Sequence, residues 1–131
     1  MEIPVGASHT ETVMVNETNV ASAVGSGMVD VFATPMMIAL MELAAAQCLG
    51  KFLDKGMVSV GTHVNVEHSG ATPIAMRVFA TVTVANVDRR RVDFDVLVTD
   101  EAGEVGKGTH TRFIVDKDKF TEKALAKRNA K

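Results

Sequence analysis

An almost entirely apolar segment runs from Val31 to Gly50 and reads VFATPMMIALMELAAAQCLG. Thr34 is a good helix N-cap, Pro35 suits the first helical position, and Gly50 suits the C′ position just after a helix. The segment therefore predicts a helix over residues 35–49. Because this helix is apolar nearly all round, other elements must wrap it.

One ionisable side chain, Glu42, interrupts this helix near its middle. Burying an unpaired charge is costly, so Glu42 must be paired, protonated or directed into a hydrated site. His68 ends the alternating run VSVGTHVNVEH at residues 58–68. A carboxyl group and a histidine that point into one cleft are common signs of acid–base chemistry, which makes Glu42 and His68 the first candidate site residues.

The rest of the chain predicts mostly strands. Loose alternation indicates a first strand over 9–15, and residues 16–30, rich in Asn, Ser, Gly and Ala, indicate a loop or broken helix that could cover a pocket. Four further strands are expected at residues 58–68, 77–87, 91–100 and 105–115. A charged helix is expected over 116–131. Short turns force antiparallel pairing, so we predict an α+β fold with one curled antiparallel sheet around the long helix.

Alternation also predicts which strand residues face the helix. In the strand at 58–68 the set that includes His68 is Val60, Thr62, Val64, Val66 and His68, and the opposite set is Ser59, Gly61, His63, Asn65 and Glu67. In the strand at 91–100 the inward set is Val92, Phe94, Val96 and Val98. His68 is therefore expected to point towards the buried helix.

The composition limits the possible functions. A length of 131 residues indicates a single domain, with a core over 9–120 and a charged tail at 121–131. The net charge is −2, the longest basic block is Arg89–Arg91, and Trp and Tyr are absent, which argues against a nucleic-acid partner.

The single cysteine, Cys48, excludes an intrachain disulfide and a thiolate zinc cluster, and this fits a reducing compartment. The apolar helix is shorter than the roughly 20 residues that span a bilayer. The N-terminus has neither the basic start nor the apolar core of a signal peptide. We therefore expect a cytoplasmic protein that does not interact with membranes.

Three blocks of sequence carry a resemblance. They read VFATPMMIALME at 31–42, VGTHVNVEHSGATP at 60–73 and EVGKGTHTRFIV at 104–115. Together they resemble the fluoroacetyl-CoA thioesterase-like branch of the hotdog fold, over about residues 10–120. The resemblance implies a hotdog fold and hydrolysis of a short acyl-CoA thioester, with sites shared between the subunits of a dimer. It implies no cofactor other than the coenzyme A of the substrate. The exposed edge and face of such a sheet independently favour a homodimer and leave a tetramer open.

The resemblance also implies roles for five residues. The catalytic threonine, glutamate and histidine of the family fall on Thr34, Glu42 and His68, and its substrate-binding glycine and arginine fall on Gly61 and Arg112. His68 is then the expected general base, with Glu42 orienting it or acting directly on water. Thr34 is the expected nucleophile or positions water. A backbone N–H near Gly61 is a candidate oxyanion donor, because a residue without Cβ allows close approach.

One distance complicates this assignment. Thr34 and Glu42 are eight residues apart in one helix. That spacing corresponds to about 12 Å along the axis at about 1.5 Å per residue. The two side chains are not expected to touch. Either His68 lies between them, or the site combines residues from two chains.

Structural roles compete with the catalytic ones. Thr34 could be only an N-cap, Glu42 could form a structural pair with Arg112, and His68 could be a satisfied residue at a strand end. The methionines at 36, 37 and 41 are expected to be core residues, and lining an adaptable acyl pocket is their secondary role.

His63 and His110 could suggest a metal pair. No carboxylate has ligand spacing to them, so no metal site is predicted.

Two other functions remain open at this point. One is a non-catalytic acyl-CoA-binding module on the same scaffold. The other is a hotdog hydratase acting on enoyl-CoA, although the Asp-His spacing typical of such hydratases is absent. The lid-like segment at 21–29 contains no aromatic residue. This composition favours small acyl groups in general over a narrow preference for fluoroacetyl.

Overall fold

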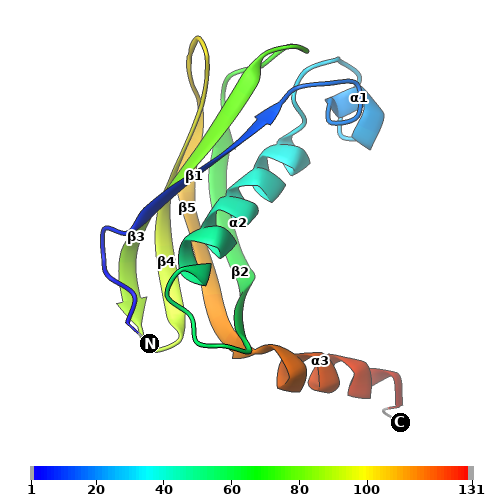
Figure 1. Cartoon of the computed structure of the whole chain (residues 1–131). Coiled ribbons are helices and arrows are strands. Elements are labelled where there is room, and N and C mark those ends of the chain that lie inside the picture. Colours follow the sequence, from blue (N-terminus) through cyan, green and yellow to red (C-terminus); the bar gives the residue numbers. More distant parts are fainter. Residues whose placement is uncertain (1, 130–131) are drawn as a thin grey trace.

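The computed structural model describes residues 2–129. Its elements are β1 (Ser8–Met14), α1 (Ala21–Val24), α2 (Thr34–Gly50), β2 (Met57–His68), β3 (Arg77–Asp88), β4 (Arg91–Asp100), β5 (Gly103–Asp116), α3 (Lys117–Ala126) and a 3₁₀ turn, η1 (Lys127–Asn129). A five-stranded sheet with the order β1-β3-β4-β5-β2 curls around α2 (Figure 1). Its strand pairs are all antiparallel, which confirms the predicted α+β arrangement.

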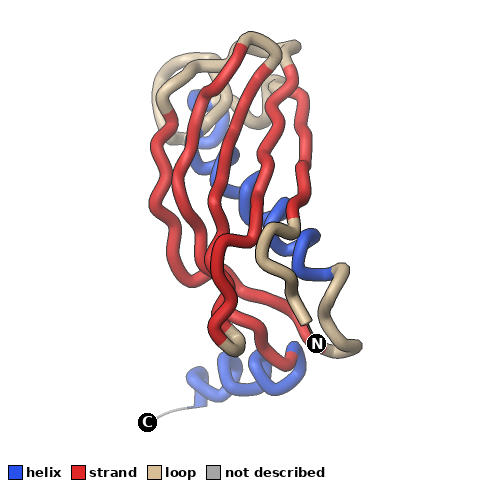
Figure 2. The backbone as a smooth tube through the Cα atoms, turned by 90° about the vertical axis from the view of Figure 1, so that its left-hand side faces the viewer, coloured by secondary structure: helices blue, strands red, loops and turns tan. Residues whose placement is uncertain are grey.

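The core lies between α2 and the concave face of the sheet. The tube view shows the sheet as one layer with α2 behind it (Figure 2). The buried residues of α2 are Met37, Leu40, Met41, Ala44, Ala45, Cys48 and Leu49. The buried residues that β3 and β4 contribute are Val78, Ala80, Val82, Val84, Val92, Phe94, Val96 and Val98. The inward set predicted for residues 91–100 is therefore confirmed. Burial of each large apolar side chain stabilises the fold by roughly 1.5–3 kcal/mol.

Consecutive strands are not always neighbours in this sheet. β2 pairs only with β5, whereas β3 pairs with β1 and β4. The connection over residues 69–76 is therefore a crossover, and the expectation that a short turn would pair these two strands is wrong. Ser69 N and Gly70 N donate to Val105 O at 2.8 and 3.0 Å and fix the start of the crossover. β1 and β2 are left as the two sheet edges.

Both ends of α2 differ from the prediction. Ala33 is the N-cap and Thr34 is already helical, without a side-chain cap. Gly50 is the last helical residue and is followed by Lys51 in a right-handed conformation. Thr34 is therefore not an N-cap, and Gly50 is not a C′ residue. The Thr34 hydroxyl is used in a tertiary contact instead.

A β-bulge in β2 changes which residues face α2. Gly61 pairs with Arg112, and the register then shifts before His63, which leaves Thr62 as the extra residue. A bulge interrupts the alternation of faces, so Gly61 and His68 both face the helix. Strict alternation placed them on opposite faces, and that prediction is wrong at the bulge.

The C-terminal helix projects from the end of β5 (Figure 1). The Asp116 carboxylate caps α3 by accepting from Lys119 N at 3.0 Å, and no residue of α3 is buried. The helix expected over 116–131 is found as α3 and η1, and its last two positions lie outside the described residues. Among residues 2–129, no helix combines the length and apolar character needed to cross a membrane.

Candidate active site

Thr34 and His68 form the first of two polar clusters along α2. Thr34 opens α2 and His68 ends β2. Thr34 Oγ1 and His68 Nδ1 are 2.7 Å apart. Burial lowers the pKa of His68, although the backbone of Gly70 acts in the opposite direction and raises it. The neutral imidazole is therefore favoured, and this is the form that can accept a proton.

The second ring nitrogen of this histidine is also distinctive. His68 Nε2 is buried and has no hydrogen-bond partner among the described residues. Buried polar atoms are nearly always paired, so an orphan nitrogen marks a place where structure alone does not account for the residue. The alternative of a satisfied strand-end histidine is therefore not supported for His68.

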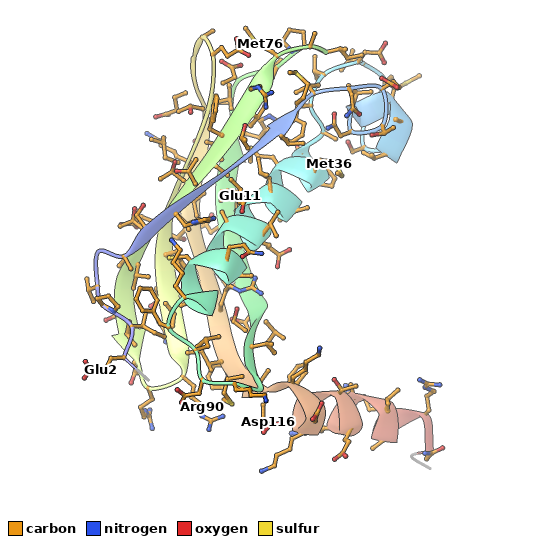
Figure 3. The ribbon with its side chains drawn as sticks, in the orientation of Figure 1. Glu2, Glu11, Met36, Met76, Arg90 and Asp116 are labelled. Atoms are coloured by element: carbon orange, nitrogen blue, oxygen red, sulfur yellow. The ribbon has the colours of Figure 1, made fainter. Side chains whose placement is uncertain are left out.

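A pocket of about 290 Å³ adjoins this pair. We call residues 21–29 the lid segment, and four of its residues line the pocket together with Phe32 and the start of the crossover. Met36 marks this end of α2 in Figure 3, whereas Arg90 and Asp116 mark the opposite end of the molecule. The pair therefore lies beneath the loop that was expected to cover a pocket.

The base of the lid segment is held by one buried amide that the sequence did not single out. Asn19 Oδ1 accepts from Asn16 N at 2.9 Å, and Asn19 Nδ2 donates to Met14 O at 3.0 Å. Asn19 is buried. These bonds fix the entry to the lid segment, so the pocket is bounded by an anchored loop.

Glu42 and Arg112 form the core of the second cluster. Arg112 Nη1 lies 3.5 Å from Glu42 Oε2, at the long limit for a hydrogen bond. Arg112 is buried, whereas the Glu42 side chain remains 43% exposed. Glu42 is thus both paired and hydrated, as a carboxylate on an apolar helix requires. Burial lowers the pKa of Arg112 and Glu42 opposes this, and the guanidinium stays charged because its ordinary pKa is far above neutrality.

Ser59 completes the coordination of the guanidinium. Arg112 Nε donates to Ser59 Oγ and Arg112 Nη2 donates to Ser59 O, both at 2.8 Å. Ser59 faces Arg112 because it lies two residues before Gly61, upstream of the bulge. The strand-face prediction failed for both residues for the same reason.

Gly61 is required by close packing within this cluster. A Cβ at Gly61 would collide with Glu42 Oε2 and would lie 3.2 Å from His110 Cε1 and 3.3 Å from Arg112 Nη1. No side chain fits there, although the backbone conformation does not itself demand glycine. Gly61, Glu42 and Arg112 therefore lie together within one chain.

The two clusters remain separate within one chain. No hydrogen bond between residues 2–129 joins Glu42 to Thr34 or His68. Gly61 and His68 are seven residues apart on β2, which corresponds to roughly 20 Å along the strand. The expectation that Thr34 and Glu42 do not touch is confirmed, and His68 does not lie between them in one chain.

His110 also belongs to the Arg112 cluster. The sequence had suggested a role for it only as a possible metal ligand together with His63. His110 is fully buried beside Arg112. Its spacing of two from Arg112 on one strand was the available signal, since such residues share a face. Within the described part of the chain, no group of three or more His, Cys, Asp or Glu residues could hold a metal ion.

Comparison with known proteins assigns the family. A family model described as fluoroacetyl-CoA-specific thioesterase matches residues 15–118. The chain belongs to this family. A curated relative, the fluoroacetyl-CoA thioesterase of Streptantibioticus cattleyicolor, is 37% identical to this thioesterase over 98 residues, covering 75% of this chain and 70% of the relative.

Solved structures agree with the family assignment. The fluoroacetyl-CoA thioesterase FlK matches with a TM-score of 0.91 and 30% identity, covering 97% of this chain and 98% of that one. A thioesterase superfamily member from Thermus thermophilus matches at 0.85 with 28% identity, over 97% and 93% of the two chains. A hot-dog-like protein from Thermanaerovibrio acidaminovorans matches at 0.86 with 26% identity, over 98% and 94%. This thioesterase is therefore a thioester hydrolase with the hotdog fold.

Proposed function

We propose that this protein hydrolyses short acyl-CoA thioesters with Thr34, Glu42 and His68 as its catalytic residues. The observation that carries the proposal is the contact of 2.7 Å between Thr34 Oγ1 and His68 Nδ1 beside a small pocket. The family match supports thioester chemistry. Mutants of the related FlK have been solved with fluoroacetate and CoA and with acetyl-CoA, which supports a small acyl group on coenzyme A.

The strand register supports a site completed by a second copy of the chain. β2 is a sheet edge whose residues 61–65 are exposed. The β5 partners of Gly61, Asn65 and His68 are Arg112, Thr109 and Gly106, so Gly61 and His68 lie equally far from Asn65. Two β2 edges that pair antiparallel about a two-fold axis at Asn65 would set Gly61 opposite the partner's His68.

This pairing would unite the two clusters. Glu42, Gly61 and Arg112 of one chain would face the Thr34–His68 pair of the other, on the same side of a continuous sheet. The bulge at Thr62 contributes to this fit, because without it Gly61 and His68 would face opposite sides. A homodimer along β2 is therefore part of the proposed function.

In the proposed reaction Thr34 is the nucleophile. His68 Nδ1 takes the proton of the Thr34 hydroxyl while Oγ1 attacks the thioester carbonyl carbon. Donors near Gly61 stabilise the oxyanion. The C–S bond breaks, coenzyme A leaves as a thiolate, and the proton held by His68 passes to it.

The acyl–Thr34 ester is then hydrolysed by water. Glu42 accepts a proton from the water molecule as its oxygen attacks the ester carbonyl. The Thr34 oxygen leaves and takes up the proton held by Glu42, which restores both side chains, and the carboxylic acid is released. Arg112 holds Glu42 in place beside the substrate. The lid segment is rich in Gly, Ser and Ala and contains no aromatic side chain that could select narrowly for fluoroacetyl. Small acyl groups in general are therefore the proposed substrates.

The first test follows free thiol release from a panel of short acyl-CoAs. Release by the wild-type protein is expected, and a covalent acyl adduct on Thr34 should be detectable by mass spectrometry after rapid acid quenching. Stabilisation against heating without any thiol release would contradict the proposal and would favour an acyl-CoA-binding module.

A mixing experiment tests the shared site. Thr34→Ala and Glu42→Gln are each expected to be inactive alone. Refolding them together should restore about a quarter of the wild-type turnover, because half of the dimers would be mixed and each would contain one intact site. If mixing restores nothing, the site lies within a single chain and the dimer proposal is wrong.

A further inference from the structure

His110 is a buried histidine that the reaction proposed above does not use. It lies on β5 with no exposed surface, and its ring stacks against Phe94 of β4 at 6.3 Å between centroids. The charged or titratable groups around it are Glu42 from α2, His63 from β2 and Arg112 from its own strand. A polar ring placed this deeply needs both of its nitrogens satisfied.

Both ring nitrogens are satisfied, and each contact requires the same tautomer. His110 Nδ1 is 2.8 Å from the carbonyl oxygen of His63, which can only accept, so Nδ1 carries the hydrogen. His110 Nε2 is 3.2 Å from Arg112 Nη1, which can only donate, so Nε2 must offer its lone pair. Only the neutral Nδ1–H imidazole meets both requirements.

Protonation of this ring would disrupt the cluster. An imidazolium would direct an N–H of Nε2 at the N–H of Arg112 and would place two positive charges side by side. Burial and Arg112 accordingly both lower the pKa of His110. The ring is therefore built to remain neutral while the guanidinium beside it stays charged.

The same contact completes the fixing of Arg112. Two of the guanidinium nitrogens are held by Ser59, and Nη1 is shared between His110 Nε2 and Glu42 Oε2. A planar guanidinium held at its three nitrogens cannot rotate. His110 thus determines the direction in which Nη1 meets Glu42.

We propose that His110 is a positioning residue for thioester hydrolysis, a neutral Nδ1–H imidazole that orients Arg112 towards Glu42. The inference rests on the proposed function because it assigns catalytic importance to Glu42. His110 itself touches no substrate. By fixing Arg112, it keeps the Glu42 carboxylate in one position with its contact to Arg112 Nη1 intact.

The tautomer is tested on the wild-type protein, without reference to activity. Two-bond nitrogen–proton correlation spectra of ¹⁵N-histidine-labelled protein should show His110 with a protonated Nδ1 and a bare Nε2 between about pH 5 and 8. An Nε2–H tautomer, or an imidazolium in this range, would overturn the proposal. This result stands even if the protein fails to hydrolyse any thioester.

A matched pair of variants tests the positioning role. His110→Asn keeps a donor for the His63 carbonyl and removes the acceptor for Arg112, whereas His110→Gln keeps an acceptor at the Nε2 position and gives up that donor. His110→Asn is expected to lower kcat about tenfold or more relative to His110→Gln, with little change in KM, because small misplacements of catalytic groups are costly.

The melting temperatures of both variants separate positioning from folding. Similar melting temperatures with the expected difference in kcat would support positioning. Equal kcat values in the two variants, or a loss of kcat that only follows the loss of stability, would overturn it. Absence of turnover in the wild-type protein would refute the proposed function instead.

Discussion

The two polar clusters along α2 differ in how completely their atoms are bonded. Within the described part of the chain, the Thr34–His68 pair has one short hydrogen bond and a buried nitrogen without a partner. The Arg112 cluster satisfies every guanidinium nitrogen and both nitrogens of His110. In the first cluster a histidine nitrogen is left available to react, whereas in the second the guanidinium is held in one orientation. This difference predicts that substitutions in the first cluster affect rate, and that substitutions in the second affect both rate and stability.

The largest expected effect is on turnover. His68→Ala and Glu42→Gln should each lower kcat by about 100-fold or more, at the low end of what acid–base groups contribute. His68→Ala should leave the melting temperature nearly unchanged, because its ring forms a single hydrogen bond among residues 2–129. Thiol release and thermal melting measure the two quantities. Wild-type turnover in both variants would refute the assignment of these residues.

The next largest effect is expected at Gly61. Gly61→Ala should displace the Glu42 carboxylate and lower kcat about tenfold or more, because its Cβ has no room. Gly50→Ala is the matched control, since a Cβ there meets nothing within 4 Å. The control should keep full activity and gain up to about 1 kcal/mol of stability from its helical position. Equal activities of the two variants would show that the cluster tolerates displacement.

Stability should reveal the dense bonding of the second cluster. Arg112→Lys removes the fork of donors and leaves Ser59 and His110 acceptors without partners. The free energy of unfolding should fall by about 1–3 kcal/mol, the usual cost of an unsatisfied buried polar group. Denaturant titration measures this value. A change below the error of the titration would mean that water replaces the guanidinium without cost.

The smallest effect is a dependence on pH. Burial lowers the pKa of both His68 and His110 in the folded protein, so the unfolded chain takes up protons first as the solution is acidified. Their stabilising contribution is present above the ordinary histidine value of about 6.5 and is lost as the pH falls through their folded values. The acidic limb of kcat/KM should likewise have its midpoint below about 6.5. A midpoint above that value would contradict the environment of His68.

Periodicity predicted the regular parts of this fold. The strand at 91–100 has the predicted bounds and inward residues, because it alternates without interruption. The long helix differs from its predicted span by one residue at each end. In contrast, the segment that joins β2 to β3 was misread, since local turn signals do not tell which strands pair.

Tertiary contacts explain what the sequence did not predict in the site. The bulge at Thr62 inserts one residue into an otherwise regular pattern, and only pairing with β5 reveals it. The Thr34 hydroxyl leaves its expected capping role for His68, a residue distant in sequence. The role of His110 depends on a carbonyl and a guanidinium from two strands, a combination that no spacing of residue types encodes.

Cys48 has a practical consequence for measurements on this protein. It is the only cysteine of the chain, it is fully buried, and burial raises the pKa of its thiol. A thiol reagent should therefore react with released coenzyme A and leave the folded protein unlabelled. When the substrate is omitted, the rate at which the reagent labels Cys48 measures how often the core opens. That rate gives the free energy of opening under native conditions.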